Sequence, residues 1–343
     1  MKLKKSEPLD KVGRIGWIDT LKGICMIVII MNHIPGESEF AARFTYPFEL
    51  VGFFFVAGVT FSLKDCFSSF FIAKFKRLVI PVFAFGILNI LLSLPFKDFD
   101  VLGRLKGIFL QISGKWDDMW FVACLFVMEL MYYPIERFIE KSGIKVTIIS
   151  LLCGMGILWS VFVDKPLPWH IINALLFLPF LMVGKLLTST GKILDLEKKI
   201  KDNIWQVIIP ILLYCISILI FNNWPIDVHL LEFGNPFIFV ISAILGLTVV
   251  TCISIVLNNQ SFKYLNKILI FIGANTLVVY GLQSKAISIF DTIFNKLDYL
   301  FPEEINISWV LVLICVLPVL ALASIIINRW FPFMIGNFNL KKK

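Results

Sequence analysis

Charged residues are scarce in this sequence. Asp, Glu, Lys and Arg together make up 16% of its 343 residues, whereas soluble domains contain about 25%. Apolar residues make up 58%, and no polar stretch is long enough to build a core of its own. The composition therefore argues against a soluble protein and favours one that is embedded in a membrane.

Other familiar signals are missing too. The seven cysteines form no CxxC pair and lie mostly in apolar runs, so we expect small core residues and no disulfide framework or metal site. The first apolar segment lacks a small-residue cleavage site and others follow it, so we expect no cleavable signal peptide. Nucleic-acid binding would need a basic patch on a soluble surface, and we expect no such partner.

Long apolar runs take the place of these signals. A bilayer core about 30 Å thick needs roughly 20 mostly apolar residues per helix. The sequence therefore predicts an all-α polytopic membrane protein with about ten transmembrane helices, near residues 17–34, 47–63, 78–95, 118–134, 146–163, 170–188, 204–221, 236–257, 268–289 and 308–328. We expect a single transmembrane domain over 1–343, with a basic segment at 1–16 and a basic tail at 339–343.

Lysine and arginine are unevenly distributed around these helices. With the N-terminus inside, 23 of the 32 lie in predicted cytoplasmic segments and 8 in outer segments, while Lys22 lies within the first span. Positive residues concentrate on the cytoplasmic side of membrane proteins. We therefore expect both termini in the cytoplasm, and we interpret the net charge of +8 as an orientation signal and as contact with anionic membrane lipids.

The first predicted helix carries three titratable residues. Lys22 and His33 are eleven residues apart, which places them on one face and roughly 16 Å apart along the axis. Asp19 shares this face and can pair with Lys22. Because a charged residue in a span costs roughly 2.5–3.5 kcal/mol, the face should contact protein or water. Two interpretations stay open: the face lines an internal path, or these residues are interfacial caps of the helix.

The segment RIGWIDTLKGICMIVIIMNH (14–33) resembles the first transmembrane helix of the acyltransferase-3 family, membrane O-acyltransferases that modify bacterial glycans. That helix carries a basic residue, ten further residues and a histidine, and Lys22 and His33 match this spacing. Six later segments resemble the family's motifs in order: FFFVAG (53–58), FIAKFKRLVIP (71–81), MWFVACLFVMEL (119–130), LPFLMVG (178–184), FIGANTLVVYGLQ (271–283) and INRWFPFMIGNF (327–338).

The chain departs from the family's pattern at two places. Where the sugar-acetylase subgroup usually has His-Met-Pro, this chain reads Glu49-Leu50-Val51, and Gln283 stands where a ninth-helix histidine is common. Glutamine takes no proton at neutral pH, so His33 is the only intramembrane candidate base. Because no appended extracytoplasmic domain follows the tenth span, the chain most resembles the compact sugar acetylase or exopolysaccharide acyltransferase type.

The resemblance implies transfer of an acyl group from cytoplasmic acyl-CoA, with acetyl-CoA the expected donor, to a hydroxyl of an extracytoplasmic or lipid-linked glycan. It also implies a multi-pass protein of the bacterial plasma membrane, with polysaccharide-synthesis or export proteins as partners. Lys22, Lys74 and Arg77, assisted by Arg14, are suited to the donor phosphates. The alternative for residues 74–77 is an ordinary positive-inside cluster.

The acceptor hydroxyl needs a base as it attacks the thioester. The unperturbed imidazole pKa near 6.5 suits that task, so we expect His33 to be the general base; a covalent acyl-histidine stays open beside direct transfer. Glu129 is the expected intramembrane carboxylate, which either contacts His33, Lys22 or substrate, or pairs with a neighbouring helix. Asp19 is assigned to Lys22.

Several other residues fit supporting roles. Asn275 and Gln283 either bind the thioester region or the sugar, or join helices, which is the commoner use. Trp120 either stacks on a sugar or sits in the interfacial aromatic belt, and the belt is the commoner case. His170 and His229 fall in predicted outer loops, where we expect solvent-exposed side chains.

Two functions of other classes remain. A transporter or flippase for a glycan or lipid would use the same polar face as a permeation route, and would not bind acyl-CoA. An inactive subunit of a polysaccharide-export complex would keep the fold and would tolerate the loss of His33.

Overall fold

The structure is a computed structural model that describes residues 15–36, 38–94, 100–114, 118–163, 165–221, 223–295 and 308–338. These residues form helices and connecting loops, and the part of the chain described contains no β-strand, only an isolated bridge between Asp227 and Glu232. The predicted all-α fold is confirmed. Arg14 and the tail at 339–343 lie outside the described residues.

The α-helices are α1 (Gly16–Asn32), α2 (Glu39–Thr45), α3 (Glu49–Val59), α4 (Phe67–Lys74), α5 (Ile80–Ser93), α6 (Val101–Leu110), α7 (Trp120–Phe138), α8 (Ser142–Phe162), α9 (Ile171–Ser189), α10 (Lys192–Asp202), α11 (Trp205–Phe221), α12 (Pro236–Leu257), α13 (Lys263–Ala274), α14 (Thr276–Asn295) and α15 (Ser308–Trp330). Short helices complete the set: the π-helix η2 (Phe75–Val79) and the 3₁₀-helices η3 (Pro168–His170), η4 (Gln260–Phe262) and η6 (Pro332–Ile335).

Seven helical segments of the described ranges are long and apolar enough to cross a membrane: Glu39–Val59, Phe67–Ser93, Ser142–Phe162, Pro168–Ser189, Pro236–Leu257, Thr276–Phe294 and Trp309–Trp330. The count is eight if the bent pair α10–α11 is taken as one span. The chain is thus a multi-pass membrane protein. The number is lower than the ten expected. Helix α1 has only 17 residues, fewer than a straight span usually needs, and α7 carries Glu129, Glu136 and Arg137.

The expected ninth span, 268–289, is divided in two. Helix α13 ends at Ala274 and α14 begins at Thr276. At the junction, the Asn275 side-chain amide donates to the Phe271 carbonyl over 2.7 Å. Asparagine competes in this way for backbone groups and disfavours continuous helix. The break leaves a polar side chain and two helix ends within the bundle.

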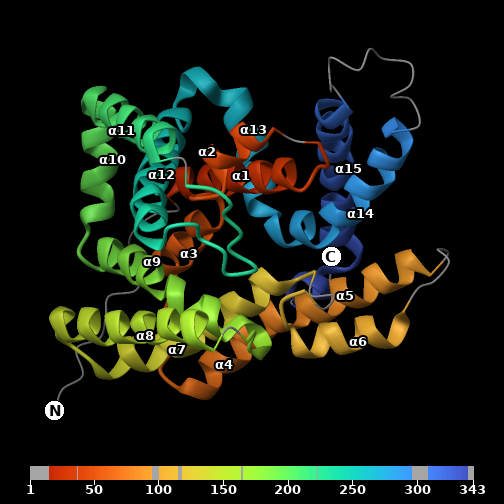
Figure 1. Cartoon of the computed structure of the whole chain (residues 1–343), viewed down its shortest axis with the longest axis horizontal. Helices are drawn as coiled ribbons and strands as arrows, with labels where there is room; N and C mark the ends of the chain where they lie inside the picture. The colour runs from red at the N-terminus through yellow and green to blue at the C-terminus, as the bar shows by residue number, and fades with distance from the viewer. Residues whose placement is uncertain are drawn as a thin grey trace.

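Helix α1 lies inside the bundle (Figure 1) and contacts α3, α12, α13 and α14. Gly23 lets the Leu269 carbonyl of α13 occupy the place where a Cβ atom would stand, and Gly273 does the same for the Asp19 carbonyl. Small residues let membrane helices approach closely enough for extensive backbone packing. Along α1, fully buried side chains include Trp17, Leu21, Cys25 and Ile30.

Helices α3 and α9 pack by the same means. A Cβ atom at Gly58 would collide with the Leu181 carbonyl, and one at Gly184 would collide with the Phe55 carbonyl. By contrast, a Cβ atom at Gly154 of α8 would meet nothing within 4 Å. The packing of α3 against α9 therefore depends on having no side chain at these two positions.

Gly184→Ala and Gly154→Ala should change stability in opposite directions. Gly184→Ala pushes α3 away from α9 and should destabilise the protein by about 1–3 kcal/mol, as overpacking does. The second adds a methyl group in open space and should be neutral or stabilising, because alanine is favoured over glycine in helices by about 1 kcal/mol. Thermal unfolding of the purified proteins in one detergent tests this. Equal changes in the unfolding temperature of the two variants would contradict the close packing of α3 and α9.

Candidate functional site

A cavity of about 640 Å³ lies between α1, α3, α7, η2 and the α13–α14 break. Five predicted site residues line it together: Lys22, Lys74, Arg77, Glu129 and Asn275. Its other polar lining residues are Thr60, Lys76, Thr276, Tyr280 and Asn337. The structure thus unites residues that are distributed over more than 300 positions of the chain.

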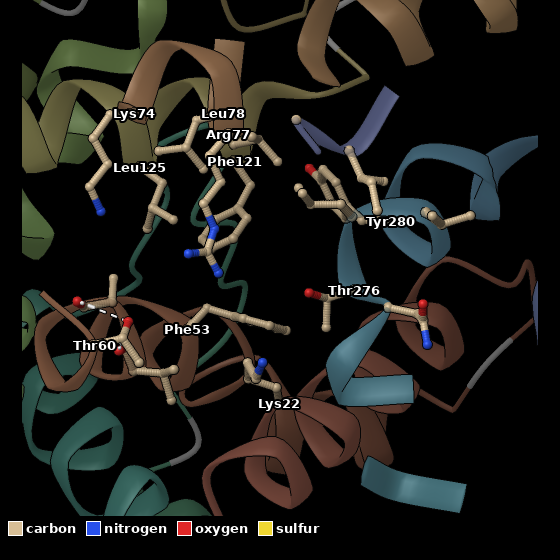
Figure 2. A pocket seen from close by; sticks show the side chains of 18 of the residues that line it. Lys22, Phe53, Thr60, Lys74, Arg77, Leu78, Phe121, Leu125, Thr276 and Tyr280 are labelled. Atoms are coloured by element: carbon tan, nitrogen blue, oxygen red, sulfur yellow. Dashed lines mark hydrogen bonds between the residues drawn. The ribbon is translucent and has the colours of Figure 1, made fainter. Parts of the chain in front are cut away.

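The basic side chains converge on one space. Figure 2 shows Lys22 reaching into the cavity from one wall, and Lys74 and Arg77 reaching in from the opposite wall. Lys76 lines the cavity as well. Four cations facing one cavity, with a single carboxylate among the lining residues, make a site that favours a polyanion.

Two of these cations, Lys76 and Arg77, stand on the widened turn η2 (Phe75–Val79). The backbone N–H of Ile80 donates to the carbonyl of Phe75, five residues back, as in a π-helix. Pro81 supplies the physical reason, since its ring would collide with the carbonyl of Arg77 four residues back in a regular α-helix. Such π-turns occur frequently at functional sites.

Residues 335–338, which follow α15, line the cavity beside Lys76. Gly336 adopts φ +73° and has no room for a Cβ atom, because the backbone of Lys76 lies against it. The ring of Phe338 lies 5.6 Å from the Lys76 ammonium. Asn337, which precedes Phe338 in the sequence, also lines the cavity. A glycine is required here for both conformation and close approach.

Lys74 and Glu129 form an ion pair of 2.7 Å between α4 and α7. Both side chains are largely buried, and the Lys74 ammonium also lies over the rings of Phe61 and Phe70. Of the alternatives considered for Glu129, the structure therefore gives pairing with a neighbouring helix. Its second oxygen, Oε2, is buried and accepts no hydrogen bond from the described residues.

The predicted pair between Asp19 and Lys22 is confirmed, at 2.6 Å. Asp19 is buried, whereas Lys22 lies at the cavity wall. The carboxylate thus offsets part of the cost of an ammonium within the bundle. The ammonium still faces the open space in Figure 2.

One face of α1 continues from the cavity toward the far end of the helix. Lys22, Met26 and Ile29 line the cavity at intervals of four and three residues, and His33 is the next position on this stripe. His33 itself is not a lining residue. It lies one turn beyond Ile29, where α1 ends.

The His33 ring is oriented by its own helix. Its Nδ1 atom lies 2.6 Å from the Ile29 carbonyl, which can only accept, so Nδ1 carries the hydrogen. In the neutral ring, Nε2 therefore holds the free lone pair. The side chain is exposed, and it interacts electrostatically with Asp227 and His229 from the loop after α11.

The other two histidines lie beside Trp120. The Trp120 ring is 4.9 Å from that of His229 and 5.2 Å from that of His170, and Ser113 Oγ is 3.4 Å from His170 Nδ1. The expectation of a solvent-exposed His170 is wrong, because the packed rings bury it to 1% exposure. Trp120, 9% exposed, is a core residue of this cluster and lies outside any lipid-facing belt.

The two amides lie apart. Asn275 lines the cavity and accepts a hydrogen bond of 2.6 Å from Asn328, so it joins helices at the cavity edge. Gln283, two turns further along α14, is buried and does not line the cavity; its Oε1 accepts no hydrogen bond within the described ranges.

Comparison with known families settles what this arrangement belongs to. Residues 15–329 match the model of the acyltransferase-3 family, described as an acyltransferase domain. The chain belongs to this family. No curated protein matches it. The chain is thus a membrane acyltransferase, and the resemblance noted in its sequence is confirmed over nearly its whole length.

Sequence reasoning missed several residues of this acyltransferase. Asp227 and His229 lie near His33. They are almost 200 positions away from it in the sequence, in a loop, so no local sequence pattern predicts this proximity. Thr60 and Tyr280 line the cavity, although each lies within or next to a segment that matched a family motif. Their polarity within apolar runs was the available signal.

The buried pair in this acyltransferase should behave as a unit in unfolding experiments. Glu129→Gln removes the partner of Lys74 and should cost about 3 kcal/mol. The double variant Lys74→Met/Glu129→Gln removes both charges and should cost about 1 kcal/mol or less. Thermal unfolding of both single variants and the double variant measures the coupling, and additive losses would show that the pair is not coupled.

Proposed function

We propose that this acyltransferase moves an acyl group, acetyl in the first instance, from cytoplasmic acyl-CoA to a hydroxyl of an extracytoplasmic or lipid-linked glycan, with His33 as the general base. One observation carries the proposal. Lys22, Lys74, Lys76 and Arg77 face one cavity, and the α1 stripe that lines this cavity leads on to His33.

The cationic end suits the donor's phosphates. Arg77 presents a planar guanidinium that binds phosphate oxygens in pairs, while lysines act as point charges. Lys74 is partly neutralised by Glu129 and Lys22 by Asp19, so Arg77 carries most of this role. Arg14, for which the sequence suggested a similar role, remains a prediction.

The middle of the cavity suits the acyl-bearing arm of the donor. Met26 and Ile29 of α1 face Phe53, Ala57 and other apolar lining residues, including Val56, Phe121, Val122 and Leu125. An apolar wall that runs from the cations toward His33 accepts an uncharged thioester arm and excludes water from it. Thr276 and Tyr280 of α14 also line the cavity and offer hydroxyl groups.

His33 is suited to proton transfer. The acceptor hydroxyl gives its proton to Nε2 as its oxygen attacks the thioester carbonyl carbon. The carbon–sulfur bond then breaks, and the CoA thiolate takes the proton from the imidazolium. Asp227, which interacts electrostatically with His33, would stabilise the imidazolium between these steps.

This assignment implies the remaining partners and location. The protein would lie in the bacterial inner membrane with both termini in the cytoplasm, and polysaccharide-synthesis or export proteins would supply the acceptor. The donor would enter at the end marked by Arg77, and the acceptor would meet it at the end marked by His33.

Loss of His33 should abolish transfer. The test uses inverted membrane vesicles that are given radiolabelled acetyl-CoA. At equal expression, His33→Ala should lower the label in glycan by about 10²–10⁴-fold, the rate factor that a general base usually contributes. His170→Ala is not a suitable control, because His170 is a core residue. Retained transfer in His33→Ala would place the base elsewhere, and no binding of acyl-CoA to the wild-type protein would favour a transporter.

Loss of Arg77 should weaken donor binding. Arg77→Ala should raise the KM for acetyl-CoA about 10- to 100-fold, as expected for a lost charge-assisted hydrogen-bonding group, with a smaller change in kcat. Arg137→Ala is the matched control, because Arg137 bonds the Asp65 carbonyl and does not line the cavity. Equal effects of the two substitutions would reject a phosphate role for Arg77.

A further inference from the structure

A second pocket, of about 460 Å³, lies where α10 and α12 end and α13 begins. Its lining residues are all polar: Lys201, Asn258, Asn259, Gln260, Lys263, Asn266 and Lys267. Three of the seven are lysines, and none is acidic. This pocket shares no lining residue with the cavity described above.

The charge of this basic pocket is mostly uncompensated. Lys263 and Lys267 are one helical turn apart on α13, where like charges repel, and neither forms an ion pair within the described residues. Lys201 pairs with Glu197 over 2.6 Å but stays 46% exposed. A bound anion would relieve the repulsion.

Hydrogen bonds of Asn266 connect the floor of the basic pocket to the neighbouring helices. Asn266, 9% exposed, donates from Nδ2 to Asn258 Oδ1 over 3.0 Å and accepts from Thr20 Oγ1 over 2.6 Å. These bonds join α13 to α1 and to the end of α12. The backbone of α13 that carries Lys263 and Lys267 is therefore tied to its neighbours, while both lysine side chains are exposed.

The surroundings of the basic pocket indicate which anion reaches it. Helix α10 bends by 94° from α11, so it lies along the membrane surface if α11 crosses the membrane. Phe262 and Tyr264 flank Lys263 in the sequence, and Trp205 follows Lys201 by four positions; these three side chains are 43%, 82% and 59% exposed. Aromatic side chains of this kind sit at the level of the lipid headgroups.

We propose that the basic pocket binds the phosphodiester headgroup of an anionic phospholipid. Lys201, Lys263 and Lys267 hold the phosphate oxygens by charge-assisted hydrogen bonds, and the amides of Asn259 and Gln260 bond the uncharged part of the headgroup. The acyl chains leave the pocket past the exposed aromatic side chains.

Native mass spectrometry of the full-length protein in detergent tests this proposal by titration with phosphatidylglycerol, phosphatidylcholine or inorganic phosphate. Wild type should prefer phosphatidylglycerol over phosphatidylcholine. Lys263→Gln/Lys267→Gln should weaken phosphatidylglycerol binding about 30-fold, at about fivefold for each lysine near an anionic headgroup. The matched control is Lys198→Gln/Lys199→Gln, which removes two exposed charges from α10 outside the pocket.

Three outcomes would overturn the proposal. Equal losses in the two double variants would mean general surface attraction, and equal binding of the two lipids would mean no headgroup site. Displacement of the lipid by an equal concentration of inorganic phosphate would mean a site for a free anion. If the double variant misfolds, Lys201→Gln serves as the test, and it should lower the affinity for phosphatidylglycerol about fivefold. Lipid binding is measured without acyl transfer, so the result is independent of the proposed function.

Discussion

A charge within a membrane bundle must find an opposite charge, a polar neighbour or water, and this constraint organises the structure around its cavity. Asp19 holds Lys22, and Glu129 holds Lys74, while Arg77 faces the open space. Each pairing also sets the rotation of a helix, because a turned helix would bring its charge to lipid. The lysines proposed to bind the anionic donor thus also belong to the ion pairs that orient α1, α4 and α7.

The features predictable from the sequence are those that one helix determines. The Asp19–Lys22 pair and the stripe that leads to His33 follow from helical spacing alone. The Lys74–Glu129 pair does not, because its members lie 55 positions apart and the sequence left the partner of Glu129 open. The break at Asn275 was missed for another reason: apolar residues flank it on both sides, so hydropathy continues where the backbone does not.

The loops were the least predictable part. Their short polar segments suggested exposed histidines, yet His170 is buried against Trp120 because a distant loop brings His229 beside it. No periodicity describes such contacts. The proposed site consequently has two halves of different origin. The cationic half rests on helices whose sequence can be interpreted, and the half at His33 depends on a loop, near Asp227, that only the fold places there.

The position of Gly336 has a consequence for biosynthesis. Its backbone rests on that of Lys76, and the neighbouring Asn337 and Phe338 complete a wall that begins with Lys22 of the first helix. Chains fold progressively as the ribosome releases them. Here α1 must be in the bilayer, and residues 335–338 must have left the ribosome, before the cavity has all its walls. Termination of synthesis just before Ile335 would therefore leave an inserted helical bundle whose cavity lacks one wall.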